Sequence, residues 1–362
     1  MASDRLFISD CEGPVSKNDN AFELTSYFVP HGDYFFALVS KYDDVLADVL
    51  KKPGYKAGYT LKLILPFLKT YGATNRKIKE YSAKNILLVP GAQETLGFVK
   101  DTMPSFMVST SYEQYISSLC TLVGFPYKNT YCTKLDLDKY EVSESEKRKL
   151  RKIREEISHM PMIEIPENAQ SMQDFSTRDQ KTIQRLDEIF WKTIAEMKSG
   201  IILQEVQPVG GGEKAKAVQN AAEKVNGNLQ DVMYVGDSIT DATCFRLVRE
   251  NEGLTVSFNG NEYAIKEAEI AVLSDNTIVT SVLADTFNTA GKDGVINLVR
   301  EWGHSGLTKH CANSTLRNRV FRLYPEKLPQ VEVTTPANKE RLIRESNAFR
   351  KKVRGEAIGR LG

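Results

Sequence analysis

Short apolar runs that stop at polar or loop-forming residues recur along this chain. They cover residues 6–8, 105–108, 201–203, 232–235, 254–258 and 270–273. An apolar run of this length, bounded by loop residues, is typical of a strand buried on both faces of a parallel sheet. Segments with helical spacing of apolar residues separate most of these runs. The pattern therefore predicts an α/β protein with a doubly wound, mainly parallel sheet.

A long helical segment interrupts this alternation directly after the first predicted strand. Residues 15–84 are rich in aromatic side chains, many at helical spacing, as in Phe35, Leu38, Val39 and Tyr42. This spacing predicts a small helical cap domain inserted into the α/β core. Its aromatic residues either form the core of the cap or line a pocket above the polar ends of the strands.

A second helical insertion is expected over residues 143–199. Ser143 with Glu146 has the spacing of a capping box, and Ser176 with Asp179 is a weaker version with the shorter acid. Its basic run over residues 147–154 faces Glu155 and Glu156, which is typical of a solvated helix face rather than of a nucleic-acid site. We interpret this insertion as a lid or as a contact with another copy or a partner protein.

The remaining residues divide into a core and a C-terminal extension. We assign residues 1–14, 85–142 and 200–310 to the α/β core, and residues 311–362 to the extension. The extension ends in a predicted basic helix. Its charged residues are Arg341, Arg344, Arg350, Lys351, Lys352 and Arg354, and the apolar residues among them are Leu342, Phe349 and Val353. These apolar residues could dock the helix on the body or on a partner, and a flexible, solvated tail is an equally open alternative.

Composition narrows the class of protein. The 362 residues include 41% hydrophobic residues, enough for a full core, and the net charge of +1 gives no reason to expect nucleic acid or an anionic membrane as a partner. No apolar run approaches the roughly 20 residues that span a bilayer, so we expect a cytoplasmic protein. The five cysteines are odd in number and have no CxxC spacing, which argues against a zinc site or a disulfide framework.

Two predicted strands end in carboxylates. Asp10 follows the first strand, and Asp237 follows the strand at 232–235. Because ligand sites lie at the carboxyl ends of parallel strands, these residues are expected at one edge of the sheet. A carboxylate such as Asp10 can attack the phosphorus of a phosphomonoester. Asp10, Asp237 and the backbone carbonyl of Glu12 are the oxygen ligands that Mg²⁺ prefers, and Mg²⁺ would screen the two negative charges.

The same chemistry needs a proton donor and groups that bind the phosphate. Glu12 lies two residues after Asp10 and is the candidate general acid and base. Ser109, Lys214 and the loop amides of Cys11 and Glu12 are the candidate donors to the phosphoryl oxygens. Asp241 would hold Lys214 in place. Lys216 is a rival to Lys214.

In this order, Asp10-Cys11-Glu12-Gly13, Ser109, Lys214 and Gly236-Asp237 with Asp241 resemble the four motifs of the haloacid dehalogenase (HAD) superfamily. The likeness is greatest to the phosphoserine-phosphatase-like branch, with Glu12 in place of the usual second aspartate. It covers residues 5–14, 86–140 and 201–275. The chain also resembles the archaeal HAD group labelled as subunit R of energy-converting hydrogenase A.

The resemblance implies a function. It implies a HAD-like core with a cap, and a Mg²⁺-dependent phosphatase that hydrolyses a small-molecule phosphomonoester through an aspartyl-phosphate. The replacement of aspartate by Glu12 moves the acid relative to the backbone by about a bond length, and errors of ~1 Å can lower a rate strongly. A non-catalytic subunit or scaffold with this fold, and a phosphotransferase, are therefore alternatives. A homo-oligomer or a protein partner bound through residues 143–199 or the C-terminal helix is compatible with each.

Overall fold

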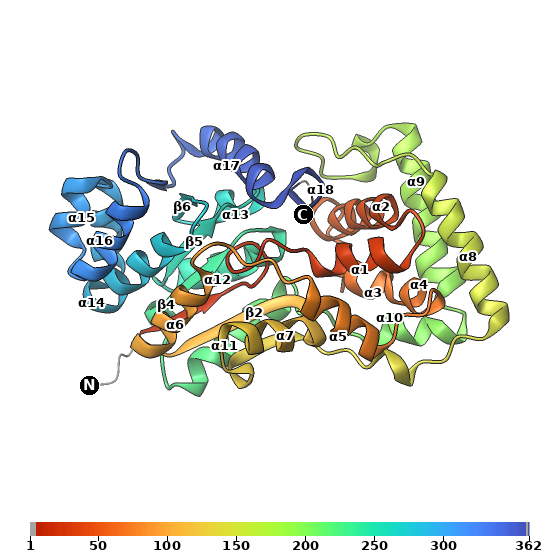
Figure 1. Ribbon diagram of the computed structural model, residues 1–362. Helices are drawn as coiled ribbons and strands as arrows, with labels where there is room; N and C mark the ends of the chain where they lie inside the picture. The colour runs from red at the N-terminus through yellow and green to blue at the C-terminus, as the bar shows by residue number, and fades with distance from the viewer. Residues whose placement is uncertain (1–4, 360, 362) are drawn as a thin grey trace.

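The computed structural model describes residues 5–359 and 361, and its centre is one seven-stranded sheet (Figure 1). The strand order is β3-β2-β1-β4-β5-β6-β7. The strands are β1 (Leu6–Ser9), β2 (Ser105–Tyr112), β3 (Thr130–Thr133), β4 (Val232–Gly236), β5 (Leu254–Phe258), β6 (Ile270–Leu273) and β7 (Gln330–Val333). All neighbouring pairs are parallel except β6 with β7. The predicted α/β class with a mainly parallel sheet is therefore confirmed.

The register of the central strand sets the position of the site. Ser9 pairs with Met107 on one side and with Val235 on the other. The chain order reverses at β1, because β2 and β3 lie on one side of it and β4, β5 and β6 lie on the other. Such a switch point is where ligands bind in open α/β sheets. Asp10 follows directly at this point.

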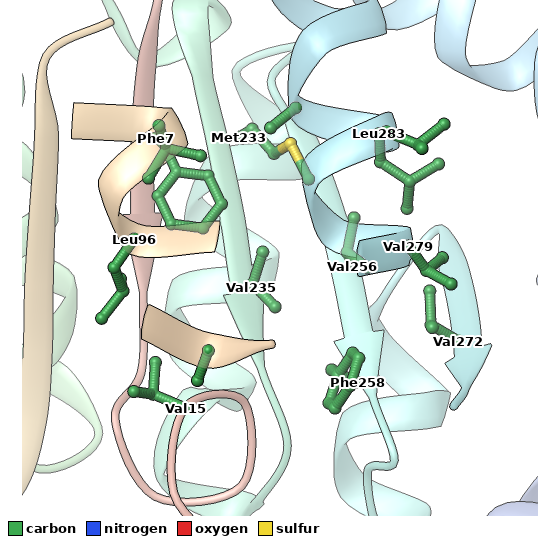
Figure 2. Packing of buried hydrophobic residues seen from close by; sticks show 14 of the residues in the cluster. Phe7, Val15, Leu96, Met233, Val235, Val256, Phe258, Val272, Val279 and Leu283 are labelled. Atoms are coloured by element: carbon green, nitrogen blue, oxygen red, sulfur yellow. The ribbon is translucent and has the colours of Figure 1, made fainter. Parts of the chain in front are cut away.

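Helices cover both faces of the sheet because every central strand is apolar on both faces. One face is covered by α6 (Ala92–Thr102), α7 (Glu113–Val123) and α14 (Ile278–Arg300). Figure 2 shows Leu96 and Val279 of these helices against strand residues such as Val235. The other face is covered by α11 (Gly212–Lys224), α12 (Ala242–Glu250) and α13 (Glu262–Glu267).

The cap is a helical domain with its own hydrophobic core. Its first part has α1 (Asn20–Phe28), α2 (Gly32–Asp44), η1 (Val45–Val49), α3 (Thr60–Leu63), α4 (Leu65–Thr70) and α5 (Asn75–Lys84). Its second part has α8 (Glu144–His159), α9 (Thr177–Glu188), η5 (Ile189–Ile194) and α10 (Ile201–Glu205). Both parts contribute buried residues to the same cluster, so the two helical insertions of the sequence pack together (Figure 1).

Two local predictions in this domain have different outcomes. The capping box of Ser143 and Glu146 at the start of α8 is confirmed, since both of its reciprocal hydrogen bonds are present. The strand predicted at residues 201–203 is wrong, because this segment is helix α10. Its buried residues Ile202 and Leu203 belong to the core of the cap. An apolar run this short has the same pattern in a strand and in a buried helix.

The C-terminal extension is folded onto the core. After α15 (His304–His310) and α16 (Ser314–Leu323), strand β7 adds an antiparallel edge to β6. Helix α17 (Lys339–Arg354) then buries Leu342 and Ile343 against Ile265 and Ala271. The alternative of a flexible, solvated tail is therefore wrong. Figure 1 shows α17 beside α13 and the last short helix α18 (Glu356–Gly359) near α2 of the cap.

No helix of the described residues combines the length and the apolar character that crossing a bilayer would need.

Candidate active site

Three buried carboxylates converge at the carboxyl ends of β1 and β4. Asp10, Asp237 and Asp241 each place one carboxylate oxygen within 4.8 Å of the others. Their side chains are almost completely shielded from solvent. Asp10 and Asp237 come from neighbouring parallel strands, and the short 3-10 turn after β4 returns Asp241 to the same place. The geometry thus brings together the carboxylates that the sequence predicted.

Lys214 lies between two of these carboxylates. Its Nζ is 2.7 Å from Asp10 Oδ2 and 2.7 Å from Asp241 Oδ1, and its side chain has no exposed surface. Asp241 also accepts hydrogen bonds from Tyr234 Oη at 2.6 Å and from the Asp237 amide at 3.0 Å. Lys216, the rival in the sequence, is exposed and pairs with Glu213. The structure therefore brings Lys214, and not Lys216, to Asp10.

The protonation of these groups follows from burial and from one another. Burial alone would raise the pKa of Asp241, but Lys214 holds it below its ordinary value. Burial opposes the charge of Lys214, yet Asp10 and Asp241 together keep the pKa of that lysine above its ordinary value. Burial, with the charge of Asp241, raises the pKa of Asp10 to about 8, although Lys214 acts in the opposite direction. Further positive charge near Asp10 would therefore favour its ionised form.

The loop after β1 is shaped by Gly13 and by its own amides. The Cys11 amide donates to Asp10 Oδ1 at 2.6 Å, while the Cys11 side chain is buried in the core. Gly13 has a φ of +103°, and a Cβ there would lie 2.1 Å from Asp237 Oδ2. Only glycine allows this approach between the loop and Asp237.

Glu12 is held within the same loop. Its Oε1 accepts a hydrogen bond from the Asn20 amide at 2.7 Å. Burial, followed by the charge of Asp19, raises the pKa of Glu12 well above its ordinary value. A glutamic acid with a raised pKa holds its proton more firmly than an exposed one, which suits a group that protonates a leaving group.

Ser109 lies on β2 next to the loop. Met107 pairs with Ser9 in the parallel register, so Ser109 is level with Cys11. Its side chain is buried, and its Oγ accepts a hydrogen bond from the Ser111 amide at 3.2 Å. Ser109 and Lys214 are not among the residues that line the adjacent cavity, whereas Asp10 and Glu12 are.

A cavity of about 100 Å³ separates the carboxylates from the cap. The core contributes Asp10, Glu12 and Asp237, and helix α2 of the cap contributes polar side chains that include Asp43 and Asp44. Of the aromatic residues in the cap, Phe36 alone is found among the described residues lining this cavity. The others mainly fill the core of the cap, as Tyr42, Phe35 and Phe67 do. A small, polar ligand fits this cavity better than an apolar one.

Two arginines of the C-terminal helix also line the cavity, and the sequence did not place them there. Arg350 and Arg354 each donate through Nη1 to Asp237 Oδ2, and the second contact is 3.0 Å long. The signal available was their spacing of four residues, which puts both on one face of α17. Nothing in the sequence pattern indicated which surface this face would meet.

The donor set fits Mg²⁺. Asp10 and Asp237 offer carboxylate oxygens within 4.8 Å of one another, and hard oxygen ligands are those that Mg²⁺ selects. Asp241 is the third carboxylate, but it is engaged by Lys214 and Tyr234. The residues that would hold the ion are therefore Asp10 and Asp237, with Asp241 in support.

Comparisons with known proteins give a structural neighbour over the whole chain. No model of a protein family matches this sequence, and no curated protein matches it. The gene product AF1437 from Archaeoglobus fulgidus is similar over 99% of both chains, with 26% sequence identity and a TM-score of 0.81. Core, cap and C-terminal extension thus occur together in both proteins.

Two other solved structures are less similar to this chain than AF1437 is. A phosphoserine phosphatase, described as an analogue of its phospho-aspartyl intermediate, matches 78% of this chain and 98% of its own, with 14% identity and a TM-score of 0.41. A haloacid dehalogenase-like protein of unknown function from Agrobacterium tumefaciens matches 77% of this chain and 97% of its own, with 13% identity and a TM-score of 0.37. These two likenesses are too distant to carry an argument about function.

Proposed function

We propose that the protein is a Mg²⁺-dependent phosphatase of the HAD type, which hydrolyses a small-molecule phosphomonoester through an aspartyl-phosphate on Asp10. The observation that supports this most directly is the contact of Lys214 Nζ with Asp10 and Asp241, at 2.7 Å each, beside Asp237. The order of the sequence motifs supports the same chemistry. The reaction would take place in the cytoplasm, with no nucleic acid or membrane involved.

In the first half of the reaction, a carboxylate oxygen of Asp10 attacks phosphorus and the bond to the leaving oxygen breaks. Glu12 gives its proton to that oxygen, which leaves as an alcohol. A bound Mg²⁺ supplies the positive charge that lets the anionic carboxylate approach the anionic phosphate. Lys214 already faces Asp10, so its ammonium can stabilise the charge on the transferred phosphoryl group.

In the second half, Glu12 takes a proton from water. The water oxygen forms a bond to phosphorus, the bond to Asp10 breaks, and inorganic phosphate is released. Ser109 and the loop amides would bind phosphoryl oxygens during both halves. The cap would exclude bulk water during transfer, because residues of α2, together with Leu361, line the same cavity as Asp10.

Replacement of the nucleophile tests this function. We expect Asp10→Asn to fold and to lose the Mg²⁺-dependent hydrolysis of 4-nitrophenyl phosphate down to the background rate. Asp101→Asn is the matched control, since Asp101 is exposed at the end of α6, and it should hydrolyse the ester like the unaltered protein. Unchanged turnover in Asp10→Asn would refute the assignment of the nucleophile.

A second assay separates an enzyme from a non-catalytic scaffold of the same fold. Mg²⁺ with beryllofluoride forms an analogue of an aspartyl-phosphate, and it should raise the melting temperature of the unaltered protein but not that of Asp10→Asn. No rise in the unaltered protein would favour a scaffold. Acceptance of the phosphoryl group by added alcohols instead of water would indicate a phosphotransferase.

A further inference from the structure

The contact between the C-terminal helix and Asp237 is buried and strongly charged. The side chains of Arg350 and Asp237 have 3% and 2% of their surface exposed, and that of Arg354 has 5%. Charge pairs that are shielded from water interact more strongly than pairs at the surface. Both guanidinium groups bind the same oxygen, Oδ2, of a residue that the proposed function needs as a cation ligand.

The oxygen that the arginines bind faces the loop after β1. Asp237 Oδ2 is the atom that a Cβ on Gly13 would meet first, at 2.1 Å. Gly13 follows Glu12, and Asp10 lies on the same cavity as both arginines. The guanidinium groups therefore occupy an oxygen of Asp237 at the cavity that Asp10 also lines.

Further hydrogen bonds fasten α17 to two loops of the core. Arg354 donates through Nε to the Lys17 carbonyl at 3.1 Å and through Nη2 to the Asn18 carbonyl. Ser346 Oγ donates to the Gly260 carbonyl at 2.6 Å. The two bonds of Arg354 join α17 to the loop after β1, and the bond of Ser346 joins it to the loop after β5; both loops follow strands at the active-site edge.

The second half of α17 is held by polar contacts. The buried residues of the whole helix are Leu342, Ile343, Ser346 and Arg350. The two apolar ones, Leu342 and Ile343, both lie in its first half. Arg350 Nε is also buried without a hydrogen-bond partner. A buried polar group without a partner is unfavourable. Within α17, the arginine end is therefore held mainly by its polar contacts and by the docking of the following residue Leu361 in the core of the cap, whereas Leu342 and Ile343 hold the first half of the helix on the α/β core.

We propose that Arg350 and Arg354 compete with the divalent cation for Asp237, so that the end of α17 is an internal latch on the active site. In the latched state the arginines neutralise Asp237. In the loaded state the cation takes Asp237 and the arginine end of α17 moves away. This inference rests on the proposed Mg²⁺-dependent function and adds its regulation by the C-terminal extension.

Direct measurement of Mg²⁺ binding tests the latch. Isothermal titration of Mg²⁺ into the full-length protein should give a dissociation constant about tenfold or more lower for Arg350→Gln/Arg354→Gln than for the unaltered protein, because the competing state is removed. Arg344→Gln is the matched control, since Arg344 is exposed on the same helix, and it should bind Mg²⁺ like the unaltered protein. Equal or weaker binding by the double variant would overturn the latch and make the arginines orienting groups for Asp237.

A second measurement needs no variant that could fail to fold. Hydrogen exchange of residues 346–354 in the unaltered protein should become faster when Mg²⁺ and beryllofluoride are added. Unchanged or slower exchange would overturn the latch. The latch alone is wrong if hydrolysis depends on Asp10 and Mg²⁺, but the double variant does not bind Mg²⁺ more tightly and hydrogen exchange of residues 346–354 does not become faster. If the unaltered protein and the double variant neither bind Mg²⁺ nor hydrolyse the ester, the proposed function and the latch fail together.

Discussion

Replacement of Lys214 by methionine should destabilise the folded protein strongly. Lys214 is completely buried and lies 2.7 Å from a carboxylate oxygen of both Asp10 and Asp241. Methionine has a similar length and no charge, so it leaves the carboxylates without their ammonium. Removal of one partner from a buried ion pair lowers the free energy of unfolding by about 3–5 kcal/mol. We expect Lys214→Met near the lower end, because Tyr234 and the Asp237 amide still donate to Asp241.

The size of this loss should depend on pH. Lys214 holds the pKa of Asp241 below its ordinary value, so this pair stabilises the fold above the pKa of about 3.9 in the unfolded chain. That contribution disappears as the pH falls through the folded pKa of Asp241. The variant lacks it at every pH. The gap between the two proteins is therefore largest near neutral pH and shrinks in acid.

Urea denaturation at several pH values measures this gap, and a double-variant cycle with Asp241→Asn measures the coupling. Asp241→Asn should destabilise the fold less when it is combined with Lys214→Met than when it is made in the unaltered protein, by at least about 1 kcal/mol. Lys216→Met is the matched control, because Lys216 lies two residues away on the same helix and is exposed. A loss below about 1 kcal/mol in Lys214→Met, or a cycle that is additive within about 0.5 kcal/mol, would refute the reasoning.

Two further predictions concern a glycine and a lysine. Gly13→Ala should lower the free energy of unfolding by about 2 kcal/mol or more, because alanine would have a strained φ of +103° and would clash with Asp237. Gly54→Ala is the control, since Gly54 has a φ of +77° but open space around it. In thermal melts, Gly54→Ala should lose less stability than Gly13→Ala. Burial lowers the pKa of Lys62 to about 8, so its charge destabilises the fold below that pH and the penalty fades as the pH rises toward about 10.4. Lys62→Met should therefore melt higher than the unaltered protein at pH 7 by a margin that shrinks at pH 10, and a margin independent of pH would contradict this account.

The strands that carry the site could be predicted because buried parallel strands have a strong sequence pattern. Each apolar run ends at its polar residue, so Asp10 and Asp237 follow β1 and β4 at the same edge. Lys214 could be chosen over Lys216 only through the resemblance to known motifs. Its burial depends on how α11 packs on the sheet, and local sequence does not encode that packing.

The arginines of α17 could not be placed from sequence. Leu342, Ser346 and Arg350 recur every four residues and form the buried stripe of the helix. An arginine in such a stripe is ordinarily read as part of a solvated face, because arginine is rarely buried without a partner. The partner is Asp237, 113 positions earlier, and only the tertiary structure brings the two together.

Electrostatics joins the site and the C-terminal extension into one system. Asp10, Asp237 and Asp241 are buried together, and Lys214 supplies one positive charge to Asp10 and Asp241 only. Asp237 therefore needs a cation from elsewhere, since an unpaired buried carboxylate is strongly unfavourable. Two guanidinium groups carry the same total charge as one divalent cation. The net charge around Asp237 thus stays unchanged when Mg²⁺ replaces Arg350 and Arg354. Because both arginines line the cavity at the carboxylates, their departure would also make room there for a phosphate ester.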